Sequence, residues 1–171
     1  MFTPHLTALL VLASAASADA VGAQDAKVTI RNDTGGVAAC YRFAARGVTS
    51  EWAINTCTRA IAASADHPLN RTASTVNRGV IYYNAAEYAR AVGDFSTAID
   101  TYETRNPIVF VNRGLAYESL RPGDPIFEKR ARADYEAALA ISPDSATAKR
   151  RLKMLDRPFL ERRDPPRRII S

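Results

Sequence analysis

One short motif occurs twice in the chain, and this repetition constrains the fold more than any other sequence feature. Residues 76–82 (VNRGVIY) recur as residues 111–117 (VNRGLAY), an offset of 35 residues. Each copy precedes a stretch in which small and aromatic residues are spaced three, four and seven positions apart, the spacing of one helix face. The sequence therefore predicts an array of stacked helical hairpins, none of which could bury its apolar faces alone.

The composition agrees with closely packed helices. Alanine accounts for 31 of the 171 residues, and aromatic residues make up only 8%. Small apolar side chains allow helices to approach closely, whereas β-sandwiches and barrels use many β-branched residues. We therefore predict an all-α fold.

The repeated stretches resemble the tetratricopeptide repeat (TPR) family. Its pattern is a helix containing G-x-x-Y, a second helix containing A-x-x-x-F/Y-x-x-A, and a following proline. The resemblance implies a right-handed superhelical array of about three hairpins plus a C-terminal capping helix. A degenerate first copy keeps Ala53, Cys57 and Ala60 but lacks the G-x-x-Y pair. The matching positions, expected to pack the helices, are Gly79, Tyr82, Tyr88, Ala91, Phe95, Ala98, Gly114, Tyr117, Ala131, Tyr135, Ala138 and Pro143.

The N-terminus is predicted to be an export signal. Residues 6–13 (LTALLVLA) form an apolar core that is followed by small residues in A-x-A patterns. No Lys or Arg precedes this core, so a buried N-terminal helix is the alternative. The predicted segments are a signal peptide (1–23), a linker (24–33), a degenerate TPR hairpin (34–67), two TPR hairpins (72–105 and 107–145), a capping helix (146–157) and a basic disordered tail (158–171).

The chain has two cysteines, Cys40 and Cys57. Export to the periplasm, or secretion, places them in an oxidising compartment, which favours a disulfide. On the frame that the TPR resemblance supplies, they lie on the two helices of the first hairpin, where a disulfide would compensate for the missing G-x-x-Y pair. Two buried thiols are the alternative.

No catalytic constellation is present in the sequence. The mature chain has one histidine, His67, beside Pro68 in a predicted loop, and it has no Gly-rich phosphate loop and no H-E-x-x-H motif. We predict a protein that is not an enzyme and uses no cofactor or metal. An enzyme of unrecognised chemistry centred on His67 is the alternative.

The TPR resemblance implies a concave groove, lined by the first helix of each hairpin, that binds a protein or peptide. The groove positions are Arg42, Arg46, Asn77, Val80, Tyr83, Asn84, Asn112, Leu115 and Glu118. Asn77 and Asn112 match the asparagine with which family members hold a peptide backbone, and an amide suits that task because it both donates and accepts. Alternatively, these asparagines are merely compatible with the helix.

Charge outside the groove is assigned to the surface. Arg78 and Arg113, beside the packing stripe, are expected on the outer surface, as are Asp134 and Glu136. The net charge is +5, and residues 149–171 carry nine basic and three acidic residues, hence +6, which leaves −1 for the rest. This basic arm suits an anionic polymer or a membrane surface, or else it is a solvated helix face.

The expected function is a non-catalytic protein–protein interaction module of the cell envelope. Its partner is a protein or peptide of unknown identity. Nucleic acid is disfavoured because aromatic residues do not alternate with the basic ones. No transmembrane span is expected in the mature chain, because no apolar run reaches about 18 residues. Self-association is open, because terminal hairpin faces are exposed.

Overall fold

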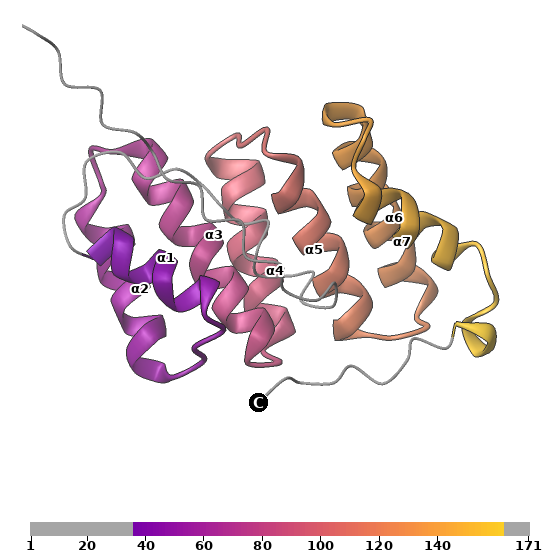
Figure 1. The fold of residues 1–171 in the computed structure, drawn as a ribbon, viewed down its shortest axis with the longest axis horizontal. Coiled ribbons are helices and arrows are strands. Elements are labelled where there is room, and N and C mark those ends of the chain that lie inside the picture. Colours follow the sequence, from indigo (N-terminus) through magenta and orange to yellow (C-terminus); the bar gives the residue numbers. More distant parts are fainter. Residues whose placement is uncertain (1–35, 163–171) are drawn as a thin grey trace, which may run out of the picture.

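The computed structural model describes residues 36–162, and within this range the chain is all helical (Figure 1). The prediction of an all-α fold is confirmed. The predicted signal peptide and linker lie outside the described residues, as do residues 163–171 of the predicted tail. The elements are α1 (Gly36–Ala45), α2 (Glu51–Ala63), α3 (Pro68–Asn84), α4 (Tyr88–Ser96), a π-helical turn η1 (Thr97–Thr101), α5 (Pro107–Leu120), α6 (Pro125–Ile141), α7 (Ala146–Leu155) and a 3₁₀ turn η2 (Phe159–Glu161).

Helices that follow one another in the chain pack against one another. The pairs α1/α2, α3/α4 and α5/α6 stand side by side, and α7 closes the end of the array (Figure 1). Helix α3 also contacts α1 extensively, whereas its contact with α5 is sparse. No helix among residues 36–162 is long and apolar enough to cross a membrane.

Asn-Pro and Asp-Pro pairs start two of the helices. Asn106 Oδ1 accepts a hydrogen bond from the Ile108 N–H at 3.0 Å, and Asp124 Oδ1 accepts one from the Ile126 N–H at 2.9 Å. Proline occupies the next position in both cases, where its missing N–H costs nothing. These prolines therefore fix where α5 and α6 begin.

Close contact between glycine and an aromatic ring holds two of the hairpins together. A Cβ on Gly79 would lie 2.7 Å from Cε1 of Phe95, and one on Gly114 would lie 2.6 Å from Cε1 of Tyr135. The predicted packing positions divide into three groups. Tyr82, Tyr88 and Tyr117 are half-buried, Pro143 is exposed in the turn before α7, and the fully buried ones are Gly79, Ala91, Phe95, Ala98, Gly114, Ala131, Tyr135 and Ala138.

We expect Gly79→Ala to lower the free energy of unfolding by about 1–3 kcal/mol, because the added methyl must displace a buried ring. Gly93→Ala is the matched control, since a Cβ on this exposed glycine of α4 meets no atom within 4 Å. That change should instead stabilise the protein by about 0.5–1 kcal/mol through helix propensity. Urea unfolding measures both, and equal effects of the two changes would contradict the packing role of Gly79.

A disulfide joins α1 to α2 in the first hairpin. The Sγ atoms of Cys40 and Cys57 are 2.06 Å apart, and both residues are completely buried. The predicted disulfide is therefore confirmed. Cys57 holds the repeat position that Phe95 and Tyr135 hold in the later hairpins. The covalent bond thus stands where those hairpins use an aromatic ring.

The chain after α7 has a defined structure up to Arg162, although the sequence predicted disorder from residue 158. The Phe159 ring covers Gly123, which has a φ of +77°, and a Cβ on that glycine would lie 3.0 Å from the ring. Arg162 pairs with Glu128 of α6 and donates to the Leu155 carbonyl at 3.0 Å. We call residues 158–162 the strap. Its main anchor, Glu128, is 34 residues away in the sequence, so local composition does not reveal it.

Candidate functional site

Two asparagines at matching repeat positions are buried, and their side-chain amides are not fully hydrogen-bonded within residues 36–162. Asn77 on α3 is 0% exposed and Asn112 on α5 is 5% exposed. Neither amide atom of Asn77, nor Nδ2 of Asn112, has a hydrogen-bond partner within the described part of the chain. Folded proteins satisfy about 90% or more of their buried polar groups, so an unpaired one requires an explanation. A polar ligand is one such explanation.

The unpaired groups continue along α3. Ser74 Oγ and Arg71 Nε are also buried and have no hydrogen-bond partner among residues 36–162. They lie three and six positions before Asn77, on successive turns of the helix. The Arg71 guanidinium stacks over the Tyr102 ring, 5.1 Å from its centroid. We call Arg71, Ser74, Asn77 and Asn112 the polar row.

A small cavity lies among α3, α4 and α5, and Asn112 is the polar-row residue that lines it. Its lining combines four of the predicted groove residues, Val80, Tyr83, Asn112 and Leu115, with Phe95. Its volume is about 10 Å³, which is close to the minimum for one water molecule. Phe95, assigned only to packing from the sequence, also contributes to this site.

The remaining predicted groove residues lie elsewhere. Glu118 is half-buried and lines a separate, larger cavity. Asn84 and Arg42 are exposed and line neither cavity, and Arg46 is exposed just beyond the end of α1. The structure therefore brings Val80 and Tyr83 of α3 to Asn112 and Leu115 of α5. Asn77 lines neither cavity, and neither do the two arginines of the first hairpin.

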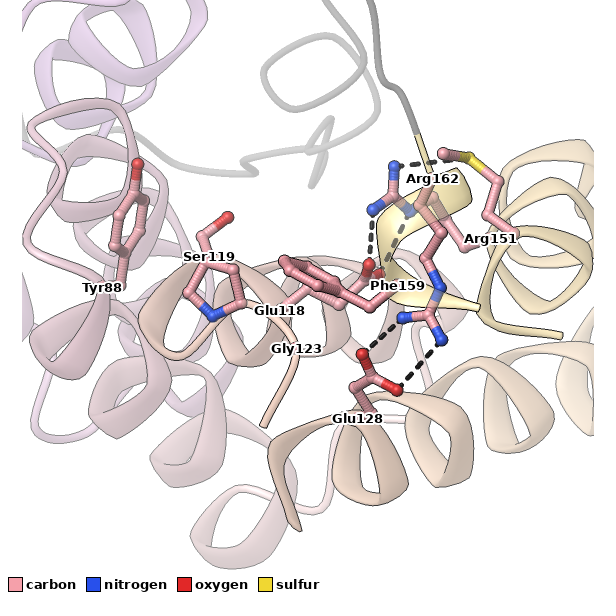
Figure 2. A pocket seen from close by; sticks show the side chains of 10 residues that line it. Tyr88, Glu118, Ser119, Gly123, Glu128, Arg151, Phe159 and Arg162 are labelled. Carbon is pink, nitrogen blue, oxygen red and sulfur yellow. Dashed lines mark hydrogen bonds and ion pairs between the residues drawn. The ribbon is translucent and has the colours of Figure 1, made fainter. Parts of the chain in front are cut away.

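The larger cavity, of about 330 Å³, opens at the C-terminal end of α5 (Figure 2). Residues from α5, the α5–α6 loop, α6, α7 and the strap line it. Arg151 pairs with Glu118, and Arg162 pairs with Glu128. The Tyr135 hydroxyl also donates to Glu118. Burial, and then the neighbouring Glu118 charge, raise the pKa of Tyr135 well above its usual value, so this hydroxyl stays protonated and continues to donate.

Tyr83 and Ser119 lie between the two cavities. Tyr83 lines the small cavity, Ser119 lines the large one, and their hydroxyl oxygens are 3.3 Å apart. The Tyr83 ring also packs edge-on against Tyr88, another residue of the large cavity. On α5, the residues Asn112, Leu115 and Ser119 follow the spacing of one helix face. The two cavities therefore adjoin along α5.

The expected surface position is wrong for Asp134, which is buried, whereas Arg78 and Arg113 are half-buried and paired. Arg78 Nη2 lies 2.8 Å from Asp94 Oδ1, and Arg113 Nη2 lies 2.8 Å from Asp134 Oδ1. In each pair Nε also donates to the second carboxylate oxygen, so both pairs are bidentate. Asp94 and Asp134 are 7% and 4% exposed. Glu136, by contrast, is exposed as expected.

A repeated sequence pattern explains these ion pairs. The arginine directly precedes the packing glycine, and the aspartate directly precedes the aromatic residue that covers that glycine. Because each arginine neighbours the glycine and each aspartate neighbours the ring, the close glycine–ring contact also brings the arginine and aspartate side chains together. Each arginine also reaches the preceding hairpin, since Arg78 Nη1 donates to Thr58 at 2.9 Å and Arg113 Nη1 to Ser96 at 3.2 Å. We call these two clusters the arginine locks.

Comparison of the chain with protein-family models, curated proteins and solved structures finds no match. The function of the site therefore has to be inferred from its own residues.

Proposed function

We propose that the protein is an exported, non-catalytic interaction module of the TPR type that holds an extended peptide segment of a partner between α3 and α5. The buried amide of Asn77 and the buried Nδ2 of Asn112, which have no hydrogen-bond partner among the described residues, carry this proposal. An extended peptide offers alternating N–H and C=O groups, and an asparagine side chain can bind both kinds. Each buried group left unpaired costs about 1–3 kcal/mol, which a peptide ligand would recover.

Access to these amides requires α3 and α5 to separate locally. Helix α3 packs chiefly on α1, α2 and α4, so its seam with α5 is the weakest contact around the site. The hydrogen bond between Tyr83 and Ser119 crosses this seam. Opening the seam would leave the hairpins intact and give a peptide access to these amides.

The buried disulfide supports the exported location. Disulfides persist in oxidising compartments and are rare in the cytosol. Cys40 and Cys57 are joined and inaccessible to solvent, as suits a permanent structural bond. We therefore propose a location in the periplasm or outside the cell.

We expect Asn77→Leu to stabilise the free protein by about 1 kcal/mol, because it replaces an unpaired buried amide with an apolar group of similar size. The same change should weaken partner binding. Urea unfolding measures the first effect. Affinity capture from envelope extract, with residues 24–171 as bait at moderate and high salt, measures the second.

Asn84→Leu is the matched control, since Asn84 lies on the same helix but is exposed and lines neither cavity. A partner that the wild type and this control retain at both salts, and that Asn77→Leu loses, supports the proposal. If Asn77→Leu destabilises the protein, the amide has a structural role, and the proposal fails.

One observation favours a second candidate, binding of an anionic polymer or membrane surface. The packed residues of α7 are Ala148, Arg151 and Leu155, and the opposite side of the helix is basic. Its exposed cations are Lys149, Arg150 and Lys153, and Arg157 is exposed just after the helix. Capture that is lost at high salt and is indifferent to Asn77→Leu would favour this candidate.

A further inference from the structure

We infer that the 330 Å³ cavity is an anchor site for one uncharged aromatic side chain bearing a hydrogen-bond donor, a tyrosine or tryptophan of the bound peptide. The inference rests on the proposed function, because the peptide would run along α5 from Asn112 to Ser119. At that point the structure passes from a cavity of about 10 Å³ to one large enough for a ligand group.

The charges around the cavity select an uncharged group. Two guanidinium groups and two carboxylates line it, and they form the pairs Arg151–Glu118 and Arg162–Glu128 (Figure 2). Their formal charges sum to zero. A charged side chain entering the cavity would bring a net charge into this balanced, half-buried set, in which each described charge already has a partner. A neutral side chain meets no such cost.

The other walls suit an aromatic ring. Tyr88 and Phe159 contribute rings, and Met154 contributes a thioether that packs well against aromatic faces. Phe159 is 50% exposed on the strap, so a bound ring would cover apolar surface that now meets solvent. Aromatic side chains with a polar tip are also the commonest anchors of protein interfaces.

The carboxylates supply the acceptor for the polar tip. Glu128 has about four lone-pair sites, and within the described residues it accepts two hydrogen bonds, both from Arg162. A phenol O–H or an indole N–H could donate to a remaining site. A tyrosine or tryptophan side chain therefore matches the cavity better than phenylalanine.

The test is an NMR titration of residues 24–171 with three amino acids whose termini are blocked, so that any charge is on the side chain. The probes are N-acetyl-tyrosinamide, N-acetyl-argininamide and the α-amide of N-acetyl-aspartate. We expect saturable shifts at Ser119 and Gly123 with the tyrosine probe, and affinities at least about tenfold weaker for both charged probes. Equal affinity for all three probes, or no saturable binding, would overturn the anchor.

Substitutions in the cavity wall test whether the tyrosine probe binds in the large cavity. Phe159→Ala should weaken binding of the tyrosine probe by about fivefold, through loss of the ring contact. Ser119→Phe should abolish it by filling the cavity. The matched control is Leu160→Ala, since Leu160 is 88% exposed on the same strap and does not line the cavity. Binding that survives both cavity changes would refute the site.

The titration needs no partner protein. It therefore tests the anchor in the large cavity independently of the proposed peptide site between α3 and α5. If the tyrosine probe does not bind while partner capture still depends on Asn77, only the anchor is wrong. If the probe binds and Asn77→Leu does not reduce capture of the partner, the proposal that a peptide binds between α3 and α5 is wrong.

Discussion

Replacing Arg113 with leucine is expected to lower the free energy of unfolding by about 3–5 kcal/mol. The change leaves the Asp134 carboxylate, whose side chain is only 6% exposed, without the two guanidinium hydrogen bonds that hold it. Breaking one partner of a buried pair costs more than removing both, because a buried charge remains. Urea unfolding at pH 7 measures the loss.

Two further variants separate charge from packing. The double variant Arg113→Leu/Asp134→Leu should recover much of the loss, because no unpaired charge remains. Arg132→Leu is the exposed counterpart, since its pair with Asp156 has side-chain exposures of 38% and 64%. That change should cost less than about 1 kcal/mol. A similar cost for Arg113→Leu and Arg132→Leu would show that the lock contributes no more than a surface pair.

The stability that Arg113→Leu removes should also depend on pH. Burial raises the pKa of Asp134, and the pair with Arg113 opposes this shift. Without Arg113 the pKa rises further, so the folded variant retains a proton that the unfolded chain releases above about pH 4. Stability of the variant then falls as pH rises from that value toward the folded pKa. The deficit relative to wild type should be smaller at pH 5 than at pH 8.

Reducing the disulfide is expected to cost about 3 kcal/mol, because the bond between Cys40 and Cys57 closes a loop with a sequence separation of 17 residues. Comparing urea unfolding of the oxidised and reduced forms measures this cost without altering a side chain. Helices α1 and α2 should lose amide-exchange protection first. The first hairpin depends on this bond, since it has no glycine–ring contact of the later type.

The double variant Cys40→Ala/Cys57→Ala is the control for the reductant. It should unfold identically with and without dithiothreitol, and near the reduced wild type. If reduction leaves the unfolding midpoint of the wild type unchanged, the bond contributes nothing beyond the packing of its two sulfurs.

The repeat pattern predicted the helices and their packing contacts because its small and aromatic residues act locally, between neighbouring helices. Gly79 and Phe95 meet as their spacing requires, and the disulfide follows from the same register. The arginine locks were predictable too. The repeated Arg-Gly and Asp-aromatic pairs carried that signal, but a charge beside a packing stripe was assigned to the surface.

The rest of the site depends on contacts that no local pattern contains. The strap forms one wall of the large cavity, and its Arg162 reaches Glu128 across 34 residues. The near-complete burial of Asn77 results from how neighbouring hairpins pack, which helix periodicity alone does not give. Arg46 was assigned to a groove-facing side, yet α1 ends at Ala45, so no helical face extends to it.

The arginine locks bear on how the array unfolds. Because Arg78 joins α3 to α4 and also to Thr58 of α2, the second hairpin cannot detach without breaking a bond to the first. Arg113 ties the third hairpin to Ser96 in the same way. Repeat arrays with weak coupling between neighbours melt in steps, whereas strongly coupled ones melt as a unit. A chain with so few hairpins thereby gains cooperativity that its small core alone would not provide.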